Sequence, residues 1–149
     1  QTCFGMMTQL KFLSLFCALL CWASCKSTQP KSGSAPEAGM FKVTILYPNG
    51  EGKTFDMDYY QKTHMPMVAG FIGKNLKFYE IDQGISGRAP GDPVPFLAIG
   101  YFYIQDIAEY NKAIAQNRDA IVKDFKNYTN VQPVVQISQV QRVAYPDKK

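Results

Sequence analysis

Cysteine is confined to the first 25 residues of this sequence, where all four copies lie: Cys3, Cys17, Cys21 and Cys25. The rest of the chain therefore cannot form an internal disulfide, use a thiol nucleophile or bind a metal through thiolates. Histidine is equally scarce, with His64 as the single copy. A metal site built from several histidines is excluded, although a single axial ligand is not.

The charge excess is also small. The 149 residues carry 16 basic and 12 acidic side chains, a net charge of +4 without a basic cluster. This balance gives no reason to expect nucleic acid as a partner. Glycine-rich phosphate loops that lead into a helix and serine nucleophile elbows are missing too. A hydrophobic content of 46%, with 13% aromatic residues, favours one globular domain.

Residues 1–25 are typical of a signal peptide, with Gln1–Gly5 as an upstream extension. Lys11 precedes the apolar run 12–22, which is too short to span a membrane. Ala23 and Ser24 come directly before Cys25, an order that resembles the bacterial lipobox. We therefore expect export to the bacterial cell envelope, with a lipid on Cys25 as the only membrane contact. The alternative is an ordinary cleaved signal and a secreted or periplasmic product.

Residues 26–39 are rich in serine, proline, glycine and lysine, which predicts a flexible tether. The domain itself is expected over residues 40–145. Alternating apolar residues predict strands, and residues spaced three and four apart predict helices. The predicted order is strand 41–47, a helix from Asp56 to about Gly70–Gly73, strand 76–82, strand 96–104, a helix from Asp106, and strand 131–140.

This β-α-β-β-α-β order predicts an α+β fold, the ferredoxin-like sandwich. Two helices can cover only one face of its four-stranded sheet. The strand 96–104 (FLAIGYFYI) is nevertheless apolar on both faces. A second copy of the chain is the simplest cover for the other face, so we expect a homodimer in which two sheets form a dimeric α/β barrel.

The helix from Asp56 carries the main candidate site. Asp56 is expected to cap its first turn, and Pro66 is expected to kink it. One stripe should face the sheet: Tyr60, His64, Met67 and Phe71.

Three segments resemble EthD-domain proteins: LYPNG…FDMDYYQKTHMPMV (46–68), GISGRAPGDPVPFLAIG (84–100) and NYTNVQPVVQISQV (127–140). The block DYYxxxHMP at 58–66 is the most specific part. The resemblance covers about residues 40–140. It implies a dimeric α/β barrel that takes small organic ligands, often aromatic or polyketide-like, in oxidative degradation.

His64 is the leading catalytic candidate, because its unperturbed pKa of about 6.5 permits proton exchange near neutrality. It occupies the histidine of the His-x-Pro block in the resemblance. Tyr60, one turn earlier, could donate a hydrogen bond to a ligand oxygen. The alternative is that His64 only satisfies a buried polar partner.

Further residues are candidates for contact with the ligand in the barrel interior. Asp82 could orient His64 or could be a solvated strand end, and tyrosines on strands are often only core or interface residues. Arg88 lies in a proline-rich loop that suits a lid or a dimer rim. Asn127 and Tyr128 are expected to cap the second helix. The ligand-binding candidates are Met67, Phe71, Tyr79, Asp82, Tyr101 and Tyr103.

Two classes of function remain open at this point. The first is an enzyme, an oxidoreductase or a proton-transfer isomerase or lyase that uses His64 on a small hydrophobic molecule. The second is a non-catalytic, lipid-anchored module that captures such a molecule. A weaker idea is a haem-binding barrel with His64 as axial ligand. Otherwise no metal or cofactor is expected.

Overall fold

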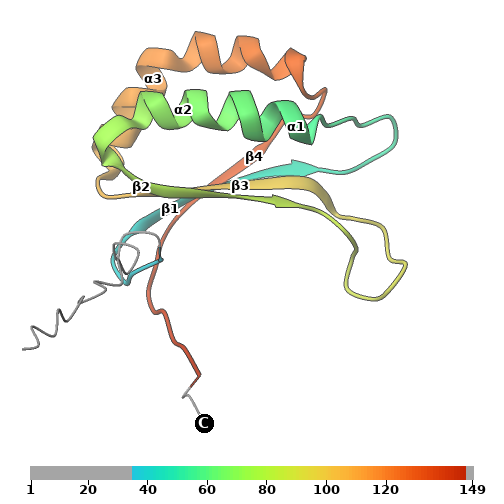
Figure 1. Ribbon diagram of the computed structural model, residues 1–149, viewed down its shortest axis with the longest axis horizontal. Coiled ribbons are helices and arrows are strands. Elements are labelled where there is room, and N and C mark those ends of the chain that lie inside the picture. Colours follow the sequence, from blue (N-terminus) through green and yellow to red (C-terminus); the bar gives the residue numbers. More distant parts are fainter. Residues whose placement is uncertain (1–34, 147–149) are drawn as a thin grey trace, which may run out of the picture.

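The computed structural model describes residues 35–146. Within this range the predicted element order and the ferredoxin-like α+β fold are confirmed (Figure 1). The predicted signal segment with Cys25, and residues 26–34 of the predicted tether, lie outside the described residues. The elements are β1 (Phe41–Pro48), α1 (Met57–Tyr59), a π-helical turn (Tyr60–His64), α2 (Met65–Ile72), β2 (Leu76–Gln83), β3 (Phe96–Ile104), α3 (Ile107–Asp124) and β4 (Val134–Gln139).

The four strands form one antiparallel sheet in the order β2-β3-β1-β4. Helices α2 and α3 lie side by side on one face of this sheet (Figure 1). The loop between β2 and β3 and the segment after β4 extend toward the other face. That face has no covering layer among residues 35–146, and we call it the open face.

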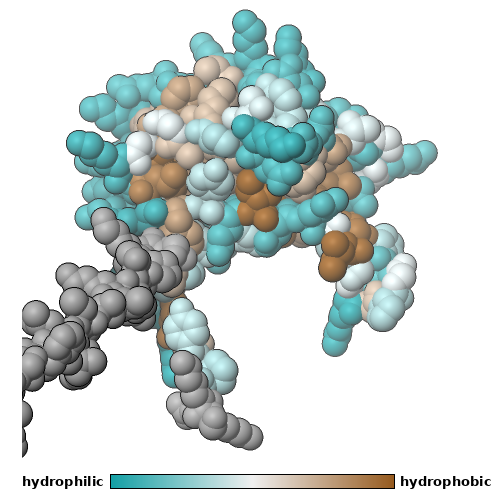
Figure 2. Space-filling view, viewed as in Figure 1, coloured by the Kyte–Doolittle hydropathy of each residue, from teal (hydrophilic) through white to brown (hydrophobic). Residues whose placement is uncertain are grey.

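Alternation along the strands divides the side chains between the two faces as the sequence predicts. On β1, Val43 and Tyr47 point toward the helices and are 0% and 1% exposed. Phe102 and Ile104 on β3 join them in the same core. In Figure 2 apolar residues are visible in the band between the helical layer and the sheet, among hydrophilic side chains. The core that positions the site therefore lies between the helices and the sheet.

Both predicted helix caps are present. The Oδ1 atom of Asp56 accepts a hydrogen bond from the backbone N–H of Tyr59 at 3.0 Å. The Oδ1 atom of Asp106 accepts one from the backbone N–H of Glu109 at 2.8 Å. Each aspartate satisfies an N–H group that has no partner within its own helix. The starts of α1 and α3 are thus fixed by short-range chemistry that can be read from the sequence.

The first helix departs from the expected regular stripe. Ahead of Pro66 the chain makes a π-helical turn, in which the N–H of Met65 reaches the carbonyl of Tyr60, five residues earlier. A π turn holds more residues than an α turn, so the side chains that follow are shifted by one position. Met67 and Phe71 are only partly buried as a result. The residues that are buried after His64 are Met65, Val68 and Ile72.

Strand β4 begins at Val134, three residues later than predicted. Pro133 lacks the N–H group that a ladder position requires, and the sheet pairing starts directly after it. Within residues 35–146, none of the helices has the length and apolar character needed to cross a membrane.

Candidate functional site

A cavity of about 300 Å³ opens between the two helices and the sheet, on the side of β4. This volume is at the lower end of the range typical of small-molecule sites. The polar side chains at its wall are those of His64, Arg118 and Gln132. The apolar part of the lining includes Val68, Phe102, Tyr110, Ile114, Ile121 and Phe125.

The imidazole of His64 is the buried polar group of this wall, with 4% of the residue exposed. Its Nδ1 atom lies 2.8 Å from a carboxylate oxygen of Asp124 at the end of α3. A carboxylate can only accept, so we assign the proton to Nδ1. Nε2 is then the unprotonated nitrogen and the one left to meet a ligand. The ring packs against Tyr128, with 4.6 Å between the ring centroids, and against Phe125.

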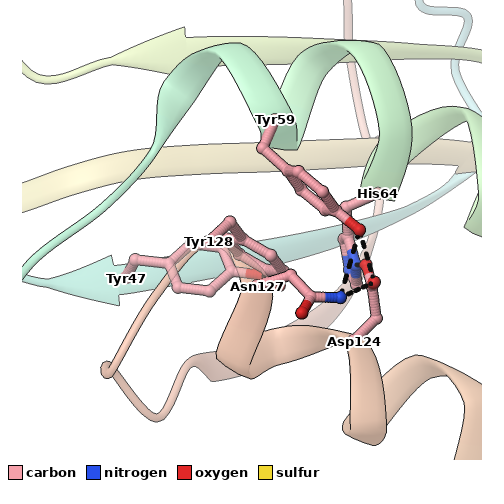
Figure 3. A network of polar contacts seen from close by, with 6 residues as sticks. All are labelled: Tyr47, Tyr59, His64, Asp124, Asn127 and Tyr128. Carbon is pink, nitrogen blue, oxygen red and sulfur yellow. Dashed lines mark hydrogen bonds and ion pairs between the residues drawn. The ribbon is translucent and has the colours of Figure 1, made fainter.

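Asp124 is held by three donors at once. Tyr59 donates its hydroxyl to Oδ1 at 2.8 Å, and the Asn127 amide donates to the same oxygen at 2.8 Å. Figure 3 shows these side chains converging with His64 on the carboxylate. Partial burial pushes the pKa of Asp124 upward, but the hydrogen bonds from His64, Tyr59 and Asn127 outweigh it and lower the pKa below the usual 3.8. The carboxylate is therefore a fixed negative charge behind the imidazole.

Burial lowers the pKa of His64 below its ordinary value of 6.5, and the neighbouring Asp124 opposes this shift only in part. The imidazole is consequently neutral at neutral pH. A neutral imidazole with its Nδ1 proton bound to a carboxylate is the form that acts as a general base through Nε2.

The π-helical turn explains how Tyr59 and His64 reach the same carboxylate. Residues five apart in a regular α-helix point about 140° away from each other. The wider turn over Tyr60–His64 brings them back toward one side. π-helical turns are frequent at functional sites. Here the turn allows Tyr59 and His64 to hydrogen bond to the same carboxylate, that of Asp124.

Tyr60, the second catalytic candidate, lies beside His64 but is not among the residues that line the cavity. Its ring stacks on the imidazole with 5.6 Å between centroids. The Tyr60 hydroxyl is buried without a hydrogen-bond partner, and it lies so close to Gly100 that a Cβ there would be only 2.3 Å away. Burial strongly raises the pKa of this phenol. Its predicted contact with a ligand oxygen stays a prediction.

The ligand-binding candidates are spread over both faces of the sheet. Tyr79 pairs with Phe102 and is on the helix side, at the sheet edge, without reaching the cavity. Met67 and Phe71 do not line the cavity either.

The other three candidates are on the open face, away from His64. Burial raises the pKa of Tyr103 to about 12, helped by its 3.0 Å hydrogen bond to Glu80. Burial, followed by the nearby Asp82 carboxylate, raises the pKa of Tyr101. The expectation that Asp82 orients His64 is wrong, because the carboxylate in contact with the imidazole belongs to Asp124. The structure therefore separates Asp82, Tyr101 and Tyr103 from His64 by the thickness of the sheet.

The loop with Arg88 is braced internally by Asp92, whose carboxylate accepts the N–H of Ala89 at 2.8 Å. It extends toward the open face, opposite the helices that border the cavity (Figure 1). Its role at a lid or dimer rim stays a prediction. Tyr128 caps the short turn Phe125–Asn127 that follows α3, with its backbone N–H donated to the carbonyl of Phe125. The side chains of Asn127 and Tyr128 also hydrogen bond to those of Asp124 and Tyr47.

Sequence reasoning missed Tyr59 and Asp124. One signal pointed to the latter, because an aspartate in the last turn of a helix is disfavoured by the helix dipole and needs a compensating partner. As for metals, the described part of the chain holds no group of three or more histidine, cysteine or carboxylate side chains arranged to bind one.

The chain matches the EthD domain over residues 49–132. An EthD-like protein from Ralstonia eutropha JMP134 is similar at 38% sequence identity and a TM-score of 0.66, over 70% of this chain and 94% of that one. An ethyl tert-butyl ether D (EthD) family protein from Bacillus halodurans C-125 shares 21% identity and a TM-score of 0.51, over 67% of this chain and 97% of that one, which shows the common fold alone. No curated protein matches the chain.

Proposed function

Because this chain belongs to the EthD domain family, we propose that it binds a small, largely apolar organic molecule beside His64 and moves a proton on it. The observation that carries the proposal is the 2.8 Å contact between His64 Nδ1 and Asp124 at the wall of an apolar cavity. A buried dyad of this kind supplies a base of fixed orientation in a place where water is scarce.

The proposed step is proton abstraction by Nε2 of His64. The donor is a carbon next to a carbonyl group or a phenolic hydroxyl of the bound molecule. The imidazolium that forms is stabilised by the Asp124 carboxylate, and it returns the proton to another atom of the same molecule. Isomerisation follows when the proton returns to a different carbon, and elimination follows when a leaving group departs. General bases of this kind typically contribute about 10²–10⁴-fold in rate.

We also propose that the working form is a homodimer. The open face carries Leu97, Ile99 and Tyr101 on β3 and Leu46 on β1, all partly buried even though residues 35–146 supply no layer above them. A second open face is the natural partner, since both surfaces have the same composition and twist. The cavity with His64 is on the opposite side of each sheet, so each subunit keeps its own site.

The test uses 2-tetralone, an apolar ketone with acidic C–H groups, in deuterated buffer. Exchange of its α-hydrogens is followed by proton NMR with wild-type protein and with His64→Ala and His64→Gln. We expect both variants to lose about 100-fold in the enzymatic exchange rate while binding of the ketone changes little. An undiminished rate in both variants would exclude His64 as the base. Saturable binding without exchange in the wild type would favour the non-catalytic capture module.

A further inference from the structure

The apolar stripe of α3 that borders the cavity contains one charged residue. Ile114 and Val122 line the cavity four residues before and after Arg118, which also belongs to the lining. Residues four apart share one face of a helix, so Arg118 occupies a position of the apolar stripe. Arg118 is nevertheless exposed as a residue. Arginine can lay its carbon chain along apolar surface and keep the guanidinium at the rim.

The residues that line the cavity include a positive charge but no negative charge. Arg118 is the permanent cation of the lining, which contains no aspartate or glutamate. Within residues 35–146 the ion pairs join Lys62 to Asp58 and His64 to Asp124, so Arg118 has no carboxylate partner in that range. Asp124 lies behind the imidazole, and its oxygens already accept from His64, Tyr59 and Asn127.

We propose that Arg118 selects an organic anion, and that the ligand of this cavity is an aromatic carboxylic acid of one or two fused rings. Its carboxylate pairs with the guanidinium at the rim, its rings fill the apolar space between Val68 and Ile121, and its far edge meets His64. The inference deepens the proposed function and rests on the same cavity. Arg118 is a specificity-determining residue in this arrangement, and His64 remains the group that takes the proton.

The size of the cavity sets the ring number. An engineered apolar cavity of roughly 150 Å³ holds one benzene molecule. The cavity here, at about 300 Å³, has room for a bicyclic body. A guanidinium binds a carboxylate through two parallel hydrogen bonds, which lysine cannot reproduce. The pairing should favour an acid over a neutral molecule of the same shape by about tenfold in affinity.

The experiment compares 2-naphthoate with 2-naphthamide, a neutral molecule of nearly the same shape. Calorimetric titration is carried out on wild type, Arg118→Gln, Arg118→Lys and the control Arg142→Gln, which removes an exposed positive charge elsewhere. We expect the wild type and R142Q to prefer the acid about tenfold. R118Q should bind both compounds equally, and R118K should keep part of the preference. Added salt should lower the affinity for the acid but not for the amide, because salt screens the ion pair between the carboxylate and Arg118.

A cavity-filling variant fixes the location of binding. Ile121→Trp should lower the affinity for both compounds by tenfold or more. Thermal unfolding checks that the variant still folds. If the wild type binds both compounds equally, Arg118 does not select the anion, and the proposed function still stands. If I121W leaves the affinity for the acid intact, the acid binds outside the cavity and the inference fails. If neither compound binds, the inference fails, and the exchange of 2-tetralone decides the proposed function separately.

Discussion

The Nδ1 atom of His64 lies 2.8 Å from Oδ2 of Asp124, 60 residues further along the chain. The contact joins the π-helical turn ahead of α2 to the last turn of α3. It fixes the orientation of the single histidine of the sequence.

Asp124→Ala should lower the pKa of His64 further, because the carboxylate is the group that opposes the effect of burial. It should also slow α-hydrogen exchange by about 100-fold, the upper loss typical when the partner of an orienting contact is removed. An untagged protein gives one imidazole signal, so nitrogen-15 NMR can follow both pKa and tautomer. Asp119→Asn, on the exposed side of α3, is the control. An unchanged His64 titration in D124A would contradict the pairing.

The free energy of unfolding should fall as the pH drops from 7 to 5. The unfolded chain binds a proton on His64 near pH 6.5, whereas burial holds the native pKa lower. Stability is therefore complete above the unfolded pKa and is lost as the pH falls toward the native one. Urea unfolding of wild type and His64→Gln at pH 5, 6, 7 and 8 measures the difference. Greater stability of the wild type relative to H64Q at pH 5 than at pH 7 would instead indicate a charged imidazole. Asp124, with its lowered pKa, acts in a separate window below about pH 4.

Tyr60→Phe should leave stability unchanged or raise it by about 1 kcal/mol, since the Tyr60 hydroxyl is buried without a partner. Gly100→Ala should cost about 1–3 kcal/mol, because the added Cβ would meet that hydroxyl. The double variant should recover part of this loss, which chemical unfolding of all four proteins can measure. Tyr47→Phe is the contrasting case, since it breaks the 2.8 Å hydrogen bond with Tyr128 and should destabilise. Additive effects of Y60F and G100A on the free energy of unfolding would show that the added Cβ does not meet the Tyr60 hydroxyl.

Ile99→Arg should dissociate the proposed dimer, because it places an unpaired charge in the centre of the open face. Ala115→Arg adds the same charge to the exposed side of α3 and should leave the assembly intact. Sedimentation of the two variants beside the wild type distinguishes them. A monomeric wild type at micromolar concentration would contradict the homodimer.

Local patterns were sufficient for most of the fold. The alternation in Phe41–Tyr47 predicted a strand, and Asp56 and Asp106 marked two helix starts that the structure confirms. These features depend on neighbours in the sequence, which is why they can be read from it. The same holds for the β-α-β-β-α-β order.

The arrangement of the candidate site could be predicted from the sequence only in part. Strand 96–104 is apolar on both faces, so alternation could not tell which residues face His64, and Tyr101 and Tyr103 prove to be on the other side. The partnership of His64 with Asp124 is a long-range contact that no local spacing encodes. The π-helical turn was not predicted from local spacing either, and it moved the buried stripe from Met67 and Phe71 to Val68 and Ile72.

The π-helical turn also bears on how this chain should be aligned with its relatives. Deleting one residue between Tyr59 and His64 would restore a regular helix and leave the two residues four apart, a spacing that also brings them to one face. Tyr59 and His64 could then still share Asp124. A relative without the additional residue must therefore be aligned with a one-residue gap inside the helix. A single-residue deletion in this turn should therefore be better tolerated than one within α3, where the parts of the helix on either side would rotate by about 100° relative to each other.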